Sequence, residues 1–583
     1  MASTFQLAEY LFIRLKQLDI VAIHGVAGDY NLALLDFIEP AGLYWVGNAN
    51  ELNAGYAADG YARIKGVGAI ITTFGVGELS AINAIAGAYA ERVAVVHIVG
   101  TPKLEHQDSE YFMHHNFDGQ NFYRFAEMYA AVTVAQVSLR SPGTCPEEID
   151  YVLRQCIEHS RPVYIQVPTD LVTAPVSAAR LRDRISVPHY DLTQRKEDIM
   201  TSILLRIYNA TRPVILVDGE SRSFGILPSV QRLVESTGWP TWTSPFGKGL
   251  LNETLPNVHR IYRGQCGDPV VHNFIRRSDL VLCFGPHLSS SNTYGYTSIM
   301  QRRTIFFTEK EIDTGAQVFP IPMREAVILL EQKLDMSRVV RYWAYPILPR
   351  DSSEDFSNVD SAYPITQDKF WRIISTVIQP GDIVLGETGT AGYGCQDMPL
   401  PLSARMFLPV TWLSTGYTLG AAQGAALAMR ELSFSPQYHC FGHTHTILFI
   451  GDGSFQMVAQ ELGTIIRLGL DVILFLINNG GYTSERCHHG LDRSYNDVSR
   501  WRYLQAPSFF GAGLDTFTAS VSTWGELNEL IHYSLQNARG RRGLKMVEVV
   551  MDCDDAPRGP LLQSLQRQRE EQWAAVGLGI YQW

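Results

Sequence analysis

Long apolar runs are missing from this 583-residue sequence. No stretch reaches the roughly 18 apolar residues that a bilayer-spanning helix needs. The opening segment, MASTFQLAEYLFIRL, has no basic region followed by an apolar core, and its spacing predicts an amphipathic helix instead of a signal peptide. We therefore expect no contact with a membrane.

Cysteine and basic charge are also scarce. The 8 cysteines lie far apart, without the spacing of a disulfide framework, which is typical of a reducing compartment. The formal net charge is −11, and no basic stripe is present that could meet a phosphate backbone. We expect a cytoplasmic protein that does not bind nucleic acid.

The sequence is rich in short apolar segments that alternate with helical patterns, which predicts parallel sheets with helices on both faces. The length favours three to four domains. The polar, acidic stretch RDSSEDFSNVDSAY predicts a linker. The expected organisation is an N-terminal domain, a central domain, the linker, a C-terminal domain and a terminal helix or tail, at residues 1–188, 189–348, 349–364, 365–560 and 561–583.

One stretch, residues 447–485, carries the clearest chemistry. A predicted strand ends in Gly451-Asp452-Gly453-Ser454, a helix is expected over 456–468, and a second strand ends in Asn478-Asn479-Gly480-Gly481. Parallel strands bring their carboxyl ends, and the ligand-binding side chains there, to one sheet edge. Mg²⁺ prefers oxygen ligands and keeps phosphate oxygens in its shell. The predicted metal ligands are Asp452, Asn479 and the carbonyl of Gly481; the simpler alternative is a turn and a loop without a ligand.

Several blocks, in order, give the sequence a family resemblance. They are GNANELNAGYAADGYARIKG, ITTFGVGELSAINAIAGAYAE, the HHN at 114–116, GETGT at 386–390 and the GDGS to NNGGYTSE stretch. With these blocks the chain resembles the thiamine-diphosphate-dependent 2-oxo acid decarboxylases, and among them the fungal pyruvate decarboxylases. The resemblance implies an α/β fold of three domains, each a mainly parallel sheet with helices on both faces.

It also implies a chemistry and an assembly. Thiamine diphosphate and Mg²⁺ would serve a non-oxidative decarboxylation of a 2-oxo acid to an aldehyde and CO₂, with the cofactor providing the electron sink. The cofactor would lie across a subunit interface, so that a homodimer is the smallest active unit, and a homotetramer is expected.

The residues that match the family's functional positions fall into two groups. The implied catalytic residues are Asp29, Glu51, His114, His115 and Glu485, where Glu51 would face the cofactor's pyrimidine ring and the others would move protons. The implied cofactor-binding residues are Glu51, Thr388, Thr390, Ser414, Thr415, Gly451, Asp452, Gly453, Ser454, Asn479, Gly481, Tyr482 and Thr483.

Departures from the family pattern cluster around the expected substrate. Thr415 and Ser484 stand where large aliphatic residues are usual, Gly392 where alanine is usual, and Ser291 near a phenylalanine position. Smaller walls predict a larger and more polar substrate pocket, and hence a 2-oxo acid larger than pyruvate, either aromatic or branched. The alternative is an ordinary pyruvate decarboxylase in which these substitutions are tolerated.

Three further hypotheses remain open on the sequence. A carboligase would use the same cofactor to form a hydroxyketone, and a catalytically idle regulatory subunit would bind the cofactor without turnover. The segment from His439 to His445, with three histidines and Cys440, could hold zinc, although a solvated loop is the stronger interpretation because no second ligand pair follows.

Overall fold

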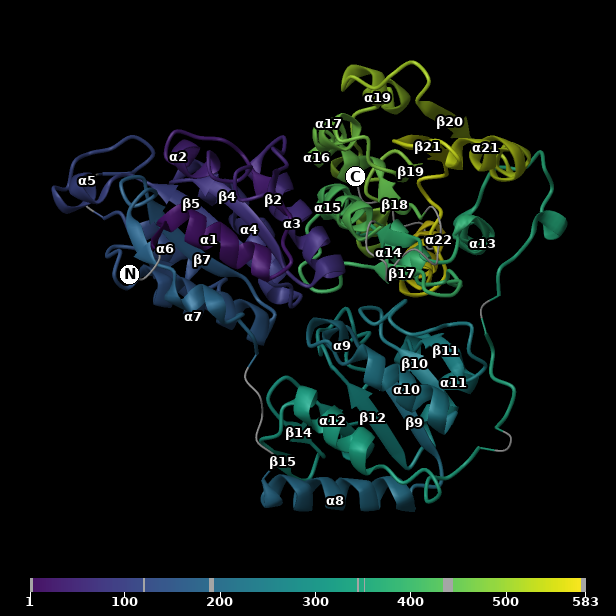
Figure 1. Ribbon diagram of the computed structural model, residues 1–583. Coiled ribbons are helices and arrows are strands. Elements are labelled where there is room, and N and C mark those ends of the chain that lie inside the picture. Colours follow the sequence, from purple (N-terminus) through teal and green to yellow (C-terminus); the bar gives the residue numbers. More distant parts are fainter. Residues whose placement is uncertain are drawn as a thin grey trace. The chain divides into compact units, whose positions relative to one another are not determined.

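The computed structural model describes residues 4–118, 121–187, 193–342, 345–350, 352–433 and 444–577. Three large sheets, each flanked by helices, account for most of the regular structure (Figure 1). The expected N-terminal amphipathic helix is present as α1 (Leu7–Gln17). Among the described residues, no helix combines the length and the apolar character that crossing a membrane requires.

The first large sheet has six parallel strands in the order β3-β2-β4-β5-β7-β6. Successive side chains of a strand face opposite sides of the sheet. Ile71 therefore packs with one pair of helices, α1 and α7, and its neighbour Ile70 packs with the other pair, α3 and α4. The bounds are β2 (Ala22–Gly25), α3 (Glu51–Lys65), β3 (Tyr44–Trp45), β4 (Gly68–Thr73), α4 (Val76–Ala90), β5 (Val95–Thr101), β6 (Ala135–Ser138), α7 (Cys145–His159) and β7 (Val163–Pro168).

The second sheet has seven strands in the order β11-β10-β9-β12-β13-β14-β15. Its first five strands are parallel, and β14 and β15 continue it as an antiparallel edge. The strands are β9 (Pro213–Val217), β10 (Thr241–Thr243), β11 (Val258–Ile261), β12 (Leu280–Phe284), β13 (Thr304–Phe307), β14 (Ile312–Asp313) and β15 (Val318–Phe319), with the helices α8 (Gln194–Asn209), α10 (Leu227–Thr237), α11 (Pro269–Arg276) and α12 (Met323–Lys333).

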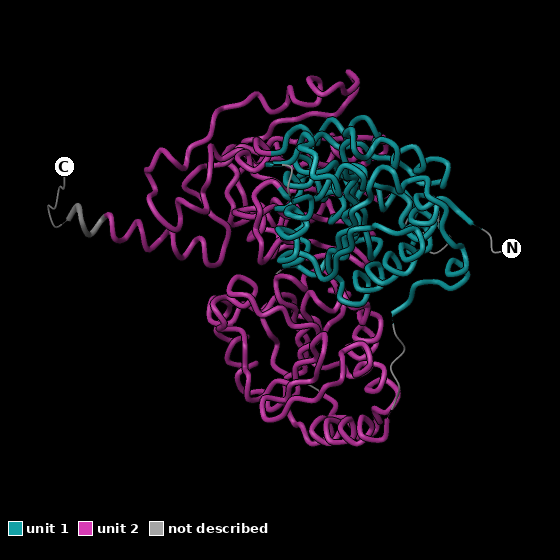
Figure 2. The backbone as a smooth tube through the Cα atoms, turned by 90° about the vertical axis from the view of Figure 1, so that its left-hand side faces the viewer, with its two compact units in different colours: residues 1–189, 417–440, 458–470 teal, residues 190–416, 441–457, 471–583 magenta. Residues whose placement is uncertain are grey.

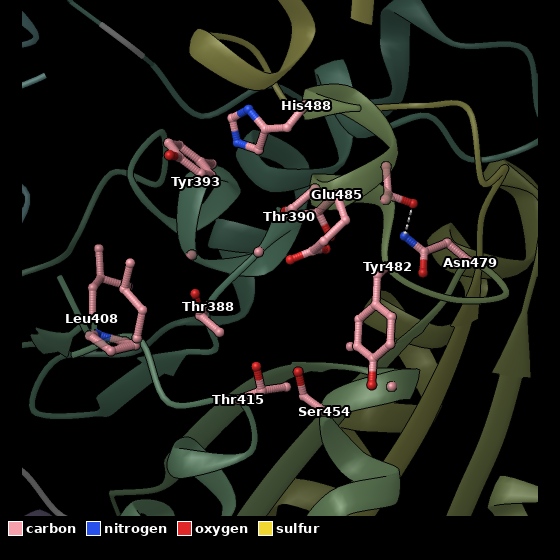
Figure 3. Close-up of a pocket in the computed structure, with 18 of the residues that line it drawn as sticks. Thr388, Thr390, Tyr393, Leu408, Thr415, Ser454, Asn479, Tyr482, Glu485 and His488 are labelled. Atoms are coloured by element: carbon pink, nitrogen blue, oxygen red, sulfur yellow. Dashed lines mark hydrogen bonds between the residues drawn. The ribbon is translucent and has the colours of Figure 1, made fainter. Parts of the chain in front are cut away.

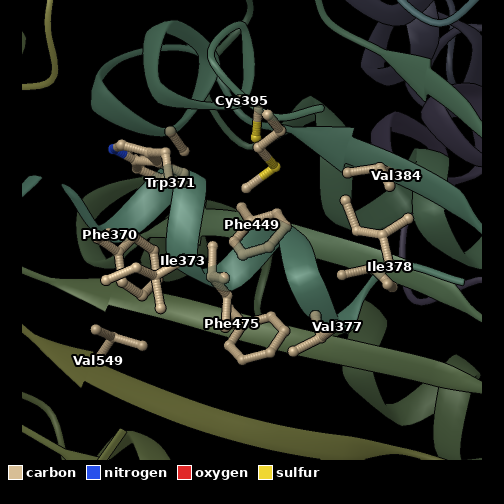
Figure 4. Close-up of a cluster of buried hydrophobic side chains, with 14 of the residues drawn as sticks. Phe370, Trp371, Ile373, Val377, Ile378, Val384, Cys395, Phe449, Phe475 and Val549 are labelled. Carbon is tan, nitrogen blue, oxygen red and sulfur yellow. The ribbon is translucent and has the colours of Figure 1, made fainter. Parts of the chain in front are cut away.

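The third sheet repeats the topology of the first. Its six parallel strands follow the order β17-β16-β18-β19-β21-β20, which is the first sheet's order when each set is numbered along the chain. Phe449 and Phe475 stack at 5.0 Å on one face of the sheet, where Trp371 also packs (Figure 4). The bounds are α13 (Gln367–Ile374), β16 (Ile383–Gly386), α14 (Thr390–Cys395), β17 (Arg405–Phe407), β18 (Thr446–Gly451), β19 (Val472–Asn478), α18 (Thr483–His488), β20 (Phe517–Val521), α20 (Trp524–Glu529), β21 (Lys545–Val550) and α22 (Pro560–Gly577).

The chain divides into two compact units (Figure 2). Unit 1 comprises residues 1–189, 417–440 and 458–470, and unit 2 comprises the remainder. Within unit 1, α15 (Tyr417–Leu432) packs closely on α3 because glycines line the contact. A Cβ at Gly424 would lie 1.8 Å from the carbonyl oxygen of Ala57, and one at Gly60 would lie 2.1 Å from that of Ala421. The boundaries expected between three domains remain a prediction.

The helix predicted over 456–468 is two helices in the structure. The first, α16 (Asp452–Val458), begins at the aspartate that the sequence placed in a turn, and α17 (Glu461–Arg467) follows after two residues. The apolar spacing continues through both helices, so periodicity alone cannot reveal the break between them.

Candidate functional site

The two glycine-rich segments meet at one edge of the third sheet, as predicted. Strands β18 and β19 run in register, with Gly451 opposite Ile477, so both end at the same level. Asp452 follows β18 and Asn479 follows β19, and both line one cavity of about 280 Å³ (Figure 3). The sheet therefore brings the carboxylate and the amide together.

The chemistry of Asp452 fits a cation. Its carboxylate is 1 % exposed, and Oδ1 accepts a hydrogen bond from the backbone N–H of Gly453 at 2.8 Å. Oδ2 is buried without a hydrogen-bond partner among the described residues. Burial raises the pKa of Asp452 to about 6. A buried carboxylate oxygen that lacks a donor is costly unless a ligand completes it, which is what a bound Mg²⁺ would do.

Asn479 and Gly481 are shaped for the same ligand. The Asn479 Nδ2 donates to the Thr483 hydroxyl at 2.8 Å, and that hydroxyl donates to the Cys553 carbonyl at 2.9 Å. This chain of bonds orients the amide so that its oxygen is left without a protein donor within the described part. Gly481 has a φ of +138°, and an added Cβ would lie 2.1 Å from the Asn496 carbonyl oxygen, so only glycine fits.

Most residues expected to contact a cofactor or substrate line this one cavity. The carboxylate of Glu485 lies in its middle, and Thr415 and Ser454 lie at one end (Figure 3). A Cβ added at Gly451 would meet nothing within 4 Å, which leaves room for a ligand. The predicted residues that line it are Ser291, Thr388, Thr390, Gly392, Thr415, Gly451, Asp452, Gly453, Ser454, Asn479, Gly481, Tyr482, Thr483, Ser484 and Glu485. Ser414, which was also predicted to bind the cofactor, is not among the described residues that line the cavity.

Three of the cavity's polar residues were missed by sequence reasoning: Tyr393, Gln396 and His488. Helical spacing could have indicated two of them. Tyr393 lies three residues after Thr390 on α14, and His488 lies three residues after Glu485 on α18, so each pair shares a helix face. Gln396 follows the end of α14 and gave no comparable signal.

Asp29, His114 and His115 form a second cluster, which belongs to unit 1. His114 Nε2 contacts Asp29 Oδ2, and His115 Nε2 lies 3.7 Å from Asp29 Oδ1. The Tyr30 hydroxyl lies 3.2 Å from His114 Nδ1, and the two rings stack at 4.9 Å. Burial opposes ionisation of Asp29, but the hydrogen bond from His114 and the charge of both imidazoles lower its pKa overall. The structure thus brings Asp29 to the adjacent His114 and His115, although Asp29 and His114 are 85 residues apart in sequence.

Glu51 also belongs to unit 1, as the first residue of α3. The preceding Asn50 caps the helix by accepting the Asn53 N–H at 2.8 Å. Glu51 lies against the first turn of α4, where a Cβ added at Gly77 would approach its Oε1 to 3.1 Å. Burial raises the pKa of Glu51 above its ordinary value, which suits a carboxyl group that exchanges a proton.

The described residues give no support to a zinc site in the segment from His439 to His445. His439, Cys440 and His443 lie outside the described residues. His445 is buried, its backbone N–H donates to Asp382 at 2.8 Å, and its Nε2 lies 3.1 Å from the Arg539 carbonyl oxygen. These contacts give His445 a structural role.

Comparisons with known proteins agree on a single family. Models of the thiamine pyrophosphate enzymes match residues 5–122 (N-terminal TPP binding domain), 200–322 (central domain) and 392–546 (C-terminal TPP binding domain). A pyruvate decarboxylase of Aspergillus parasiticus is 50 % identical over 564 residues, covering 95 % of this chain and 96 % of that protein. Pyruvate decarboxylase isozyme 1 of Saccharomyces cerevisiae is 36 % identical over 569 residues, covering 96 % and 98 %.

A solved structure shows the same fold. The thiamine diphosphate-dependent 4-hydroxybenzoylformate decarboxylase of Rhodococcus jostii RHA1 matches with a TM-score of 0.72, covering 94 % of this chain and 99 % of that one. At 17 % identity, this likeness supports the architecture alone.

Proposed function

The chain belongs to the thiamine pyrophosphate enzymes, and from this we propose how its own residues decarboxylate a 2-oxo acid and which acid they take. It is a lyase that uses thiamine diphosphate and Mg²⁺ to convert a small 2-oxo acid to an aldehyde and CO₂. The comparisons do not favour the carboligase or the idle regulatory subunit.

The observation that carries the assignment of roles is the unpartnered Oδ2 of Asp452 inside the cavity. We propose that Asp452, the Asn479 side-chain oxygen and the Gly481 carbonyl hold Mg²⁺, and that Ser454, Tyr482 and Thr390 bind the diphosphate. When bound, thiamine diphosphate supplies the sink for the electrons released with CO₂. The remaining roles belong to the protein's own proton carriers.

Glu51 is proposed to exchange a proton with the pyrimidine ring through its carboxylate. Asp29, His114, His115 and Glu485 are proposed to move protons to and from the reacting substrate. The contacts that join Asp29 to both imidazoles provide a path for such proton transfer. Thr415 lies at the same end of the cavity as Ser454 and would pack against the cofactor.

The site is proposed to be completed by a second copy of the chain. Every cavity-lining residue belongs to unit 2, whereas Glu51, Asp29, His114 and His115 belong to unit 1. A homodimer would let unit 1 of one chain serve unit 2 of the other, and two such dimers would form a tetramer. The free cysteines of the described residues agree with a cytoplasmic location, which also remains a proposal.

The proposed substrate is a 2-oxo acid larger than pyruvate, aromatic or branched. Support comes from Gly392, Ser484, Ser291 and Thr415, which all line the cavity with small side chains. Pyruvate is the second candidate because the similar fungal proteins carry its name. Steady-state CO₂ release from pyruvate, phenylpyruvate and indolepyruvate decides between them, and a clear preference for pyruvate would refute the larger substrate.

A further inference from the structure

We propose that this cavity selects 2-oxo acids whose side chain ends in a neutral hydroxyl group, and that Gln396 and Ser484, which both line it, bond that hydroxyl. The inference deepens the proposed function and rests on it. It follows from which polar residues line the cavity, which of their atoms already make hydrogen bonds, and which charged side chains the lining lacks.

The cavity has two chemically different ends. Thr415 and Ser454 lie at one, and the rings of Tyr393 and His488 lie at the other (Figure 3). Glu485 lies between them.

Gln396 presents hydrogen-bond donors to the cavity. Its Oε1 accepts a hydrogen bond from the Tyr294 hydroxyl. Burial raises the pKa of Tyr294 far above its ordinary value, so the phenol keeps its proton and donates. The amide orientation is thereby fixed, and the Gln396 Nε2 hydrogens have no partner within the described part of the chain. Gln396 lines the cavity although it is only 8 % exposed, so a ligand atom is the natural acceptor.

Ser484 presents a second unengaged group. Its Oγ is buried and has no hydrogen-bond partner in the described structure, yet the residue lines the cavity. Gly389 leaves space beside it, since a Cβ there would lie 3.3 Å from the Ser484 Oγ. A hydroxyl can donate and accept. Each of the two residues could therefore bond a substrate hydroxyl, Gln396 by donating and Ser484 by donating or accepting.

The other candidate hydroxyl is already engaged. The Ser291 hydroxyl donates to the Val410 carbonyl and also lies 3.3 Å from the Ser289 Oγ. It holds the loop that walls the cavity, and we assign it no part in recognising the substrate.

The charges on the cavity wall distinguish a hydroxyl from a second carboxylate. Of the described residues that line the cavity, none is a lysine or arginine, whereas Asp452 and Glu485 are acidic. A second carboxylate on the substrate would be desolvated without a lysine or arginine among the described cavity-lining residues to pair with it, and His488 is the one imidazole there. A neutral hydroxyl meets no such penalty.

The test compares substrates that differ by one hydroxyl: 4-hydroxyphenylpyruvate with phenylpyruvate, and 4-hydroxy-2-oxobutanoate with 2-oxobutanoate. In the holoenzyme, kcat/KM should favour the hydroxylated member of at least one pair by about tenfold or more, because the apolar member leaves two buried polar groups unpaired. 2-Oxoglutarate should be a poor substrate. A ratio near one in both pairs, or a preference for 2-oxoglutarate, would overturn the proposal.

Variants assign the effect to the named atoms. Ser484→Ala and Gln396→Leu should each lower the hydroxyl preference, mainly through KM. Tyr294→Phe should lower it too, because Tyr294 positions Gln396 without touching the substrate. Ser229→Ala is the matched control, because the Ser229 hydroxyl donates to Glu331 at 2.8 Å outside the cavity, and it should leave the ratio unchanged. An unchanged ratio in both Ser484→Ala and Gln396→Leu would refute the assignment. Turnover of pyruvate alone would instead refute the larger substrate in the proposed function.

Discussion

Asp452 illustrates how one buried side chain links stability to cofactor binding. Its pKa is raised by burial from 3.8 to about 6. A carboxyl group with a raised folded-state pKa contributes fully to stability below its unfolded pKa, and that contribution is lost as pH rises through the folded value. Above about pH 6 the cofactor-free protein therefore holds a buried charge that Mg²⁺ would neutralise.

We predict that Asp452→Asn raises the stability of the cofactor-free protein at pH 7.5, by on the order of 2–3 kcal/mol, because the buried charge is removed. The gain should shrink as the pH falls from about 6 toward 4 and be absent below that, because the carboxyl group is then protonated in both the folded and the unfolded protein. The same variant should lose Mg²⁺-dependent binding of thiamine diphosphate. Chemical denaturation at both pH values and titration calorimetry measure the two effects. Wild-type cofactor affinity in Asp452→Asn would show that this carboxylate is not a metal ligand.

Glu51 offers a second residue-scale prediction. Glu51→Gln keeps the size of the side chain and removes the exchangeable proton, so kcat should fall by about 10²–10⁴. Binding of thiamine diphosphate and Mg²⁺ should persist, because Glu51 is not among the proposed metal ligands. Steady-state kinetics and calorimetry on the same preparation separate the two, and wild-type turnover would exclude Glu51 from proton exchange.

At this scale the sequence predicted polar residues best where a strand end or a motif fixes their position. Asp452 and Asn479 follow directly from the ends of two strands. Gln396 could not be predicted, because its direction depends on a hydroxyl from Tyr294, which lies 102 residues away in sequence. Such long-range contacts leave no local pattern.

Among the elements, α17 supports the segment that precedes Glu51. The Asn48 Nδ2 donates to Glu461 Oε1 at 2.8 Å, and the Arg467 guanidinium donates to the Gly47 carbonyl at 2.7 Å. Burial raises the pKa of Glu461 to about 7. Helix α17 is the second of the two helices that the single predicted helix over 456–468 merged. It belongs to unit 1, whereas most of α16 belongs to unit 2, which explains the break between the two helices.

We predict that Glu461→Ala lowers both stability and kcat, since it removes one of the two acceptors of the Asn48 amide, the other being Gln423 Oε1 at 3.1 Å, and loosens the segment before Glu51. Loss of such a buried bond costs about 1–3 kcal/mol. Glu431→Gln is the control. This largely buried glutamate on α15 accepts a hydrogen bond from the Tyr61 hydroxyl at 2.6 Å, and Tyr61 lies toward the end of α3 away from Glu51. It should reduce the melting temperature without a comparable loss of kcat. Equal effects of the two variants on kcat would contradict a positioning role for α17.

The loop after β12 supports the cavity wall in a similar way. His287 Nε2 lies 2.7 Å from the Thr411 hydroxyl, and its Nδ1 lies 3.1 Å from Glu220 Oε1. We predict that His287→Ala raises KM by about two- to tenfold, because loss of a hydrogen bond of ordinary strength loosens the 408–413 segment. Initial-rate kinetics measure it, and an unchanged KM would show that the wall holds its shape without His287.

Across the whole molecule, the first and third sheets share one strand order although they bind different parts of the cofactor in the proposed site. Alternating strands and helices predicted this architecture, because each apolar strand must be covered on both faces. The assignment of α15 and α17 to unit 1 could not be predicted in this way. For α15 it depends on glycines of α3 and α15, which lie more than 350 residues apart in sequence and allow the two backbones to touch, and for α17 on the bonds of Glu461 and Arg467 to the segment before Glu51.

The shared site gives a prediction on assembly. Glu51→Gln and Asp452→Asn should each be nearly inactive alone. After the two variants are mixed and allowed to exchange subunits, activity should return to about a quarter of the wild-type value, because each mixed dimer regains one intact site. Light scattering should give twice or four times the 65.2 kDa of one chain. No recovery in demonstrably mixed dimers would mean that each chain completes its own site.

The most direct test of the whole account is reconstitution of CO₂ release from a 2-oxo acid by protein stripped of cofactor and metal. We predict no release with thiamine diphosphate alone or Mg²⁺ alone, and full release when both are added. Release from the stripped protein, or none with both present across the substrate panel, would contradict the account.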